Sequence, residues 1–158
     1  MTEAELTGEV EATAAAFEMP VERGKVREFA RATMSSRPEY FDDPRTVCPV
    51  TFLVTTEFWA PPEGHAVGGA VQLDPERVLH GGQEFVFHGP PPRAGTTLVA
   101  QARVDRIYEK TGRRGGTMTF VEVVTDFKDE GGTLVAESRS IVIETGVAPP
   151  KDDSKGNE

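Results

Sequence analysis

The chain has 158 residues, with 17 lysine and arginine residues against 26 aspartate and glutamate residues, and a net charge of −9 at pH 7. This length suits one compact domain, and 37% apolar residues are enough to build a single core. The acidic balance argues against a nucleic-acid partner, because phosphate binding requires clustered lysine and arginine residues and the sequence offers no block of them.

Cysteine and histidine usage argues against a disulfide-stabilised or metal-containing protein. Cys48 is the only cysteine, and the three histidines have no spacing typical of a zinc site. No apolar run approaches the roughly 20 residues that span a bilayer, and the N-terminus lacks the basic and apolar pattern of a secretion signal. We therefore expect a cytoplasmic protein without a metal or another cofactor.

The chain begins with an acidic segment that predicts a short helical arm. Residues 1–19 contain five glutamates and no base. Their apolar side chains are spaced by four, four and three positions, as on one side of a helix that ends at Pro20: Leu6, Val10, Ala14 and Phe17. We expect this arm to pack against the body of the protein or against a neighbouring subunit, with a regulatory role as the alternative.

Two further helices are predicted in the first third of the remaining chain. Lys25–Met34 has its apolar residues at helical spacing, and Ser35 and Pro38 interrupt the pattern. Val50–Trp59 is almost wholly apolar or threonine, and prolines follow it at once. We expect Val50–Trp59 to form a buried central helix.

Five segments rich in β-branched and aromatic residues follow and predict strands: Gly69–Leu73, Gln83–His88, Thr97–Lys110, Thr117–Phe127 and Leu134–Glu144. Turn-forming glycines and prolines separate them, so the last three should form an antiparallel meander. Thr117–Phe127 is apolar on both faces, so one face is expected to meet a helix and the other a partner. The glycine pair Gly81-Gly82 is expected to form a turn or a bulge.

These elements together predict an α+β fold. An antiparallel sheet of five to six strands would wrap around the central helix, as in the hot-dog fold. Residues 147–158 contain two prolines, several charges and nothing to bury, so we expect a disordered tail there.

Three ordered blocks of sequence carry a family resemblance: Val26–Ala32 (VREFARA), Cys48–Phe52 (CPVTF), and Val78–Phe85 (VLHGGQEF), which leads into Phe87–Gly95 (FHGPPPRAG). Through these blocks the chain resembles the MaoC-like dehydratase and hydratase superfamily, and more closely its N-terminal-type, FAS1-like dehydratase branch. The resemblance implies a hot-dog domain over residues 20–146. It also implies reversible addition of water across the 2,3 double bond of an acyl thioester, carried on coenzyme A or on an acyl carrier protein.

The residues that active members of this superfamily use for catalysis are not found at the matching positions. Active members carry Gly-Asp, any residue, Asn-Pro, an aliphatic residue and His on one loop. Aligning that proline on Pro38 puts Ser35, Arg37 and Tyr40 in place of the Asp, the Asn and the His. Serine is not a base near neutral pH, and tyrosine, with a reference pKa of about 10, stays protonated there. We therefore expect no catalytic residue, a prediction that a carboxylate and an imidazole of this chain converging in one cleft would contradict.

The resemblance then implies a non-catalytic subunit of a heteromeric (R)-specific enoyl-thioester hydratase or 3-hydroxyacyl-thioester dehydratase. A MaoC-like partner, in a heterodimer or a dimer of heterodimers, would supply the Asp and the His. This chain would help to form the channel for the acyl chain. The expected substrate-binding residues lie on the central segment, two as backbone N–H donors and three as apolar walls: Val50, Thr51, Phe52, Phe58 and Trp59. The alternative for Phe58 and Trp59 is a place in the core.

Two other functions stay open. A homodimeric hot-dog protein that binds acyl thioesters or another apolar ligand without catalysis would share the fold but need no partner subunit. A hot-dog thioesterase would need a carboxylate on the central helix, where Glu57 is the candidate.

The remaining reactive or charged residues have weaker assignments. Cys48 has no histidine near it in the sequence, so a buried structural role is favoured over a nucleophile. His80 and His88 are left without a role. A cationic trio could meet the phosphates of coenzyme A or an acidic carrier protein, or lie in solvated loops: Arg93, Arg113 and Arg114.

Overall fold

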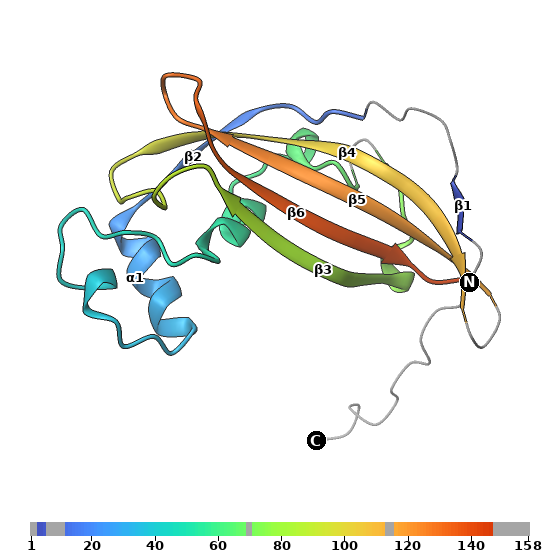
Figure 1. The fold of residues 1–158 in the computed structure, drawn as a ribbon, viewed down its shortest axis with the longest axis horizontal. Helices are drawn as coiled ribbons and strands as arrows, with labels where there is room; N and C mark the ends of the chain where they lie inside the picture. The colour runs from blue at the N-terminus through green and yellow to red at the C-terminus, as the bar shows by residue number, and fades with distance from the viewer. Residues whose placement is uncertain (1–2, 6–11, 69–70, 113–115, 147–158) are drawn as a thin grey trace.

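The computed structural model describes residues 3–5, 12–68, 71–112 and 116–146. Its described residues form a six-stranded antiparallel sheet (Figure 1). The four long strands pair in the order β4, β5, β6, β3: β3 (Val78–Phe87), β4 (Thr97–Thr111), β5 (Thr117–Lys128) and β6 (Leu134–Glu144). Two short strands, β1 (Glu3–Glu5) and β2 (Phe17–Pro20), pair with the other edge of β4.

The predicted meander of β4, β5 and β6 is confirmed. The β5–β6 turn is closed by Asp129, whose carboxylate oxygen Oδ1 accepts a hydrogen bond of 2.8 Å from the backbone N–H of Thr133. Gly132 adopts a φ of +80°, which a residue without a Cβ tolerates at little cost. The turn therefore fixes the register between the two strands.

The helical segments are short and surround one face of the sheet. They are α1 (Arg23–Ala32) and the 3₁₀ turns η1 (Pro38–Tyr40), η2 (Phe52–Phe58), η3 (Pro62–Gly64) and η4 (Pro75–Arg77). Val26 and Ala30 form the buried side of α1, as the helical spacing predicted. The main core includes Val26 together with Phe52 of η2 and Phe127 of β5, all three fully buried.

The predicted helical arm at the N-terminus is wrong wherever the structure describes it. Phe17–Pro20 is a strand, and the backbone N–H of Ala14 donates to the carbonyl oxygen of Ala102 on β4 at 2.8 Å. The edge of β4 offers unpaired backbone groups, and pairing with them also buries Met19 completely. These tertiary contacts outweigh the helical spacing. Leu6 and Val10 lie outside the described residues.

The central segment is helical but not the buried helix that was predicted. Phe52–Phe58 is a 3₁₀ helix, and only part of it is buried: Val50 and Phe58 are 58% and 87% exposed. The hydroxyls of Thr55 and Thr56 donate to carbonyl oxygens three residues earlier, at 2.8 and 2.5 Å. Such bonds favour a tight turn over a regular α-helix.

Two strand predictions also need correction. Residues 71–73 form no strand, since Val71 makes only an isolated bridge with Val67, and residues 69–70 lie outside the description. β3 begins at Val78, five residues before the predicted start. The register of β3 against β6 shifts between His80 and Gly82, so the glycine pair forms the expected bulge. A Cβ on Gly81 would lie 2.6 Å from Ile143 Cδ1, which explains a glycine there.

Candidate functional site

A cavity of about 270 Å³ lies between the sheet and the segment that follows η2. Its apolar walls come from Leu53 on η2 and from strand residues such as Val123 and Phe127. Its polar lining includes Gln83, whose amide donates to Ser138 Oγ at 2.6 Å. A small, mostly apolar hollow with a few polar groups is typical of a ligand site.

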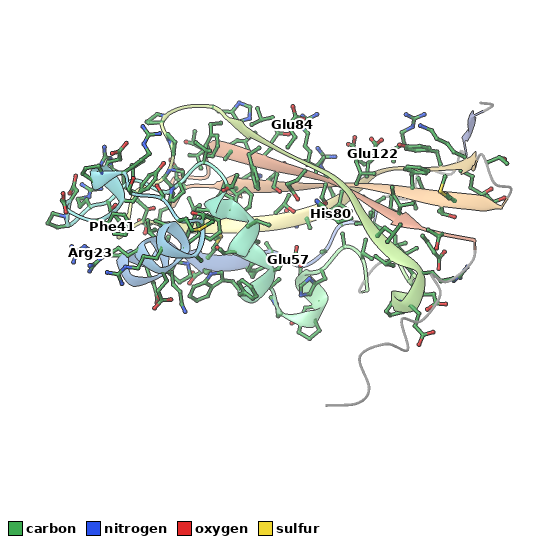
Figure 2. The ribbon with its side chains drawn as sticks, turned by 90° about the horizontal axis from the view of Figure 1, so that it is seen from below. Arg23, Phe41, Glu57, His80, Glu84 and Glu122 are labelled. Atoms are coloured by element: carbon green, nitrogen blue, oxygen red, sulfur yellow. The ribbon has the colours of Figure 1, made fainter. Side chains whose placement is uncertain are left out.

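Two histidines and one carboxylate line the same cavity. Glu57 and His65 form a close pair, with 3.2 Å between Glu57 Oε2 and His65 Nδ1. His80 enters the lining from β3, and Figure 2 labels it together with Glu57. The prolines at 61 and 62 turn the chain after η2, and this turn brings His65 back to Glu57. The contact is an ion pair only when His65 is protonated, and a neutral imidazole at this place has a nitrogen that can act as a base.

The sequence analysis expected no carboxylate and imidazole of this chain to converge in one cleft, so this pair is contrary to that expectation. Glu57 was considered only as a possible thioesterase carboxylate, and a carboxylate followed eight positions later by a histidine matches no familiar motif. The pair lies at the edge of the cavity, where the side chains of Glu57 and His65 are 71% and 32% exposed. Water therefore screens the interaction more strongly than it would in a buried dyad.

The loop that the sequence analysis aligned with the catalytic loop of active superfamily members contains Ser35, Arg37 and Tyr40. Ser35 Oγ accepts a hydrogen bond of 3.4 Å from the backbone N–H of Arg37. The Arg37 guanidinium pairs with Glu39 at 2.7 Å and lies 5.9 Å from the ring of Tyr40. Hydrogen bonds from its own backbone and from Arg37 lower the pKa of Glu39. Tyr40 is buried, and none of Ser35, Arg37 and Tyr40 lines the cavity.

The five predicted substrate-binding residues fall in three different environments. Val50 and Thr51 are exposed, and Phe52 is fully buried in the core. Phe58 and Trp59 line a second, apolar groove of about 440 Å³ between α1 and η2. None of the five lines the smaller cavity, which takes other residues of the same segment: Leu53, Val54, Thr56 and Glu57. Substrate binding by the predicted five residues stays a prediction.

The environments of Cys48 and His88 favour structural roles for both residues. Cys48 is 2% exposed, and burial raises the pKa of its thiol to about 12, so the reactive thiolate is absent at neutral pH. His88 Nε2 lies 2.9 Å from Glu137 Oε2, and Arg139 contacts the other carboxylate oxygen at 3.1 Å. The hydrogen bond from His88, followed by that from Arg139, lowers the pKa of Glu137.

The other predicted cationic residues do not form a ligand site in the described part of the chain. Arg93 donates to the carbonyl oxygen of Arg45 at 2.9 Å and lies 3.4 Å from Asp43, whereas Arg113 and Arg114 fall outside the described residues. Within the same described part, no three His, Cys, Asp or Glu side chains come together as metal ligands. None of its helices has the length and hydropathy that a membrane crossing requires.

Sequence comparisons relate the chain to proteins of similar length. A family model described as "FAS1-like, dehydratase domain region" matches residues 9–138. A UPF0336 protein of Parafrankia sp. (strain EAN1pec) is 33% identical over 142 residues, which cover 83% of this chain and 87% of the relative. A UPF0336 protein of Saccharopolyspora erythraea is 30% identical over 146 residues and covers 87% of both chains.

Structural comparisons match the fold to solved dehydratases and hydratases. A C-terminally truncated HadBC (3R-hydroxyacyl-ACP dehydratase) complex from Mycobacterium tuberculosis matches with a TM-score of 0.63 at 21% identity, over 86% of this chain and 98% of that chain. The ChsH1–ChsH2 complex of M. tuberculosis matches at 0.64 and 15% identity, over 91% and 93%. The (R)-hydratase of A. caviae matches at 0.59 and 18%, over 87% and 97%. These likenesses confirm the predicted α+β hot-dog fold.

Proposed function

The chain belongs to the family of FAS1-like dehydratase domain regions, and from this premise we propose that it is the non-catalytic, channel-forming subunit of a heteromeric (R)-specific enoyl-thioester hydratase or 3-hydroxyacyl-thioester dehydratase. A MaoC-like hot-dog subunit supplies the catalytic aspartate and histidine. The proposal is supported by the alignment that puts Ser35, Arg37 and Tyr40 in place of the catalytic Asp, Asn and His, and by the local contacts of this loop, in which Glu39 holds Arg37. We place the complex in the cytoplasm.

The occupied loop supports a non-catalytic role through its chemistry. Hydration requires a base that takes a proton from water and an acid that protonates the α-carbon. Tyr40 is buried beneath Arg37, and Ser35 Oγ is engaged by a backbone N–H. The similarity to the heteromeric HadBC and ChsH1–ChsH2 complexes supports an assembly in which another subunit performs these steps.

The cavity supports the channel role. Its walls are largely apolar, which suits an acyl chain, and Gln83 and Ser138 provide hydrogen-bonding groups along one side. None of the described residues that line it is a lysine or an arginine. The cavity therefore suits the uncharged acyl and thioester parts of the substrate, while any phosphate must bind elsewhere.

A reconstitution experiment tests this proposal. The chain is expressed alone and together with a MaoC-like subunit encoded beside it, and hydration of crotonyl-CoA is followed in both preparations. We expect hydration only by the complex, and expect it to be lost when the partner's aspartate is replaced. Robust hydration by the lone chain would refute the non-catalytic role. A stable homodimer that ignores the neighbouring gene product on a sizing column would favour a homodimeric acyl-thioester binder.

The Glu57–His65 pair favours a second candidate function, in which this chain catalyses thioester chemistry itself. His65 Nε2, with Nδ1 3.2 Å from Glu57 Oε2, would take a proton from water while the water oxygen bonds to C3 of the enoyl thioester. The double-bond electrons move towards the thioester carbonyl, and C2 then receives the proton, which restores the neutral imidazole. Attack of the same water on the carbonyl carbon would instead break the C–S bond and release the thiol.

Substitutions separate this second candidate from the first. If the lone chain turns over crotonyl-CoA, Glu57→Gln and His65→Gln should each lower the rate about 100-fold or more, because positioned acid–base groups contribute at least that much. Glu63→Gln is the matched control, since Glu63 is an exposed carboxylate of the same loop and lies outside the cavity lining. Thiol release and hydration are measured in the same samples. Absence of both from the lone wild-type chain would exclude the second candidate.

A further inference from the structure

A stripe of arginines runs along α1. Arg23, Arg27 and Arg31 are spaced by four residues, so they lie on one side of the helix, about 6 Å apart along its axis. With Lys25 they make four bases against Glu28 alone, a net charge of +3 on one helix of a chain that carries −9. The sequence does not present these bases as a block, and only the helix brings them together.

Among the described residues, no carboxylate forms an ion pair with Arg23, Arg27 or Arg31, and two of these arginines contact Phe41 instead. The Arg23 guanidinium donates to the backbone carbonyl of Phe41 at 3.3 Å, and the Arg31 guanidinium lies 5.9 Å from the Phe41 ring centre. Figure 2 shows Arg23 and Phe41 side by side at one end of the molecule. Arg27 Nε is buried without a hydrogen-bond partner among the described residues. By contrast, one arginine each of η4, β4 and β6 pairs with a carboxylate: Arg77, Arg103 and Arg139.

The position of the stripe also opposes the stability of the helix itself. Arg23 and Lys25 lie in the first turn of α1, where the helix dipole is positive, and that turn contains no acidic residue. A positive charge at a helix N-terminus is unfavourable because it lies beside the positive end of the helix dipole. A local arrangement that works against folding is expected where the residues serve an external contact.

We infer that the arginine stripe of α1 is the docking surface for an acidic carrier protein that delivers the acyl thioester. The inference rests on the proposed function and identifies its carrier. The anionic groups that fit are carboxylates four residues apart on a partner helix, because they repeat the same spacing of about 6 Å. The three charged groups are spread over about 12 Å of helix rather than converging on one point, which suits an extended protein surface better than a compact diphosphate.

An apolar groove lies on a different side of α1 from the stripe, and none of the three stripe arginines lines it. Phe29 and Ala32 of α1 form one wall, and Phe58 and Trp59 form the other. Phe58 is 87% exposed, although large aromatic side chains are usually at least partly buried. Lys25 and Glu28, which also line this groove, pair at 3.5 Å, so the charge that steers an acidic partner comes from the stripe and not from the groove.

A binding titration tests the inference directly. A fluorescently labelled acyl carrier protein in its phosphopantetheinylated form is titrated with the complex and with the lone chain, at 50 mM and 300 mM NaCl. Replacing two exposed arginines, in the variant Arg23→Gln/Arg31→Gln, should raise Kd about tenfold at 50 mM salt, since an exposed charge contact contributes about three- to fivefold. The difference should shrink at 300 mM, where screening shortens the range of the charges.

The control variant changes the net charge equally at a different place. Arg103→Gln/Lys128→Gln removes two positive charges from the sheet, and Kd should stay within about twofold of the wild type. Equal Kd values for the α1 variant and the control would overturn the inference. An equal loss of affinity for crotonyl-CoA would assign the stripe to coenzyme A instead, and loss of the MaoC-like partner on co-purification would assign it to the subunit interface.

The docking surface and the proposed function can be tested independently of each other. Hydration of crotonyl-CoA by the wild-type complex needs no carrier protein, so it reports on the proposed function alone. Normal hydration combined with unchanged carrier binding in the α1 variant would refute only the docking surface. Tight, salt-sensitive carrier binding by an inactive complex would support the docking surface and refute the hydratase role.

Discussion

Replacing Phe52 by alanine tests whether Phe52 is a core residue or a substrate-binding residue. Phe52 is fully buried, and its ring meets that of Phe29 edge-on with the ring centres 5.6 Å apart. Phe58 lies six residues later on the same 3₁₀ segment and is 87% exposed. The two substitutions, Phe52→Ala and Phe58→Ala, remove identical atoms from opposite environments, so each is the control for the other.

The structure sets the size of the expected difference. Truncating a buried phenylalanine costs about 3–5 kcal/mol of unfolding free energy, because apolar contacts are lost and a cavity remains. A loss of about 4 kcal/mol is a large share of the 5–15 kcal/mol typical of a domain. For a chain of this length, it lowers the melting temperature by about 8–16 °C. Phe58→Ala should stay within about 0.5 kcal/mol of the wild type.

Urea denaturation followed by circular dichroism measures both values, and thermal melting provides an independent check. The m-value should be unchanged in both variants, because the surface exposed on unfolding is nearly the same. A cost below about 1 kcal/mol for Phe52→Ala would refute the placement of Phe52 in the core. If Phe58→Ala destabilised the lone chain as much as Phe52→Ala, the segment would have to pack differently from the described structure.

Three further predictions concern other buried or paired groups. The Cys48 thiol should react with a disulfide reagent at pH 8 at least about 100-fold more slowly in the native protein than in urea, because its pKa is raised to about 12. His88→Ala should lower the unfolding free energy above pH 5. The difference in unfolding free energy between the wild type and His88→Ala should narrow as the pH falls below the ordinary pKa of Glu137, near 4.5. The pKa of Glu137 is lowered in the folded protein, so its pairing with His88 is stabilising only while the carboxylate is ionised. Arg77→Met should cost about 1–2 kcal/mol in urea denaturation, because Glu144, 19% exposed and 2.9 Å from Arg77, loses its cation.

The sheet was predictable from the sequence because its signals are local. β-branched and aromatic runs bounded by glycine and proline placed β4, β5 and β6 within a few residues of their observed limits. α1 was equally readable, since Val26 and Ala30 recur at helical spacing and are buried. In these segments the local preference and the tertiary contacts favour the same structure.

The N-terminal segment and the central segment were not predictable in the same way, because contacts far away in the chain decide them. Helical spacing in residues 12–20 competes with pairing to the edge of β4, about 80 positions later in the sequence, and the strand pairing is the more stable arrangement. In η2 the hydroxyls of Thr55 and Thr56 favour a 3₁₀ turn. Val50 and Phe58 are exposed, although the residues around them in the sequence are apolar. Apolar composition alone did not distinguish the inward from the outward positions.

The Glu57–His65 pair bears most directly on how the chain works. Sequence analysis predicted that no carboxylate and imidazole of this chain would share a cleft, and the structure places such a pair at the cavity edge. The pair differs from a buried catalytic dyad, since Glu57 is largely exposed and water competes for both partners. Docking of a second subunit over this edge would exclude that water and strengthen the interaction. Comparing the effect of Glu57→Gln on the hydration rate of the lone chain and of the reconstituted complex therefore tests whether the pair contributes to activity only after assembly.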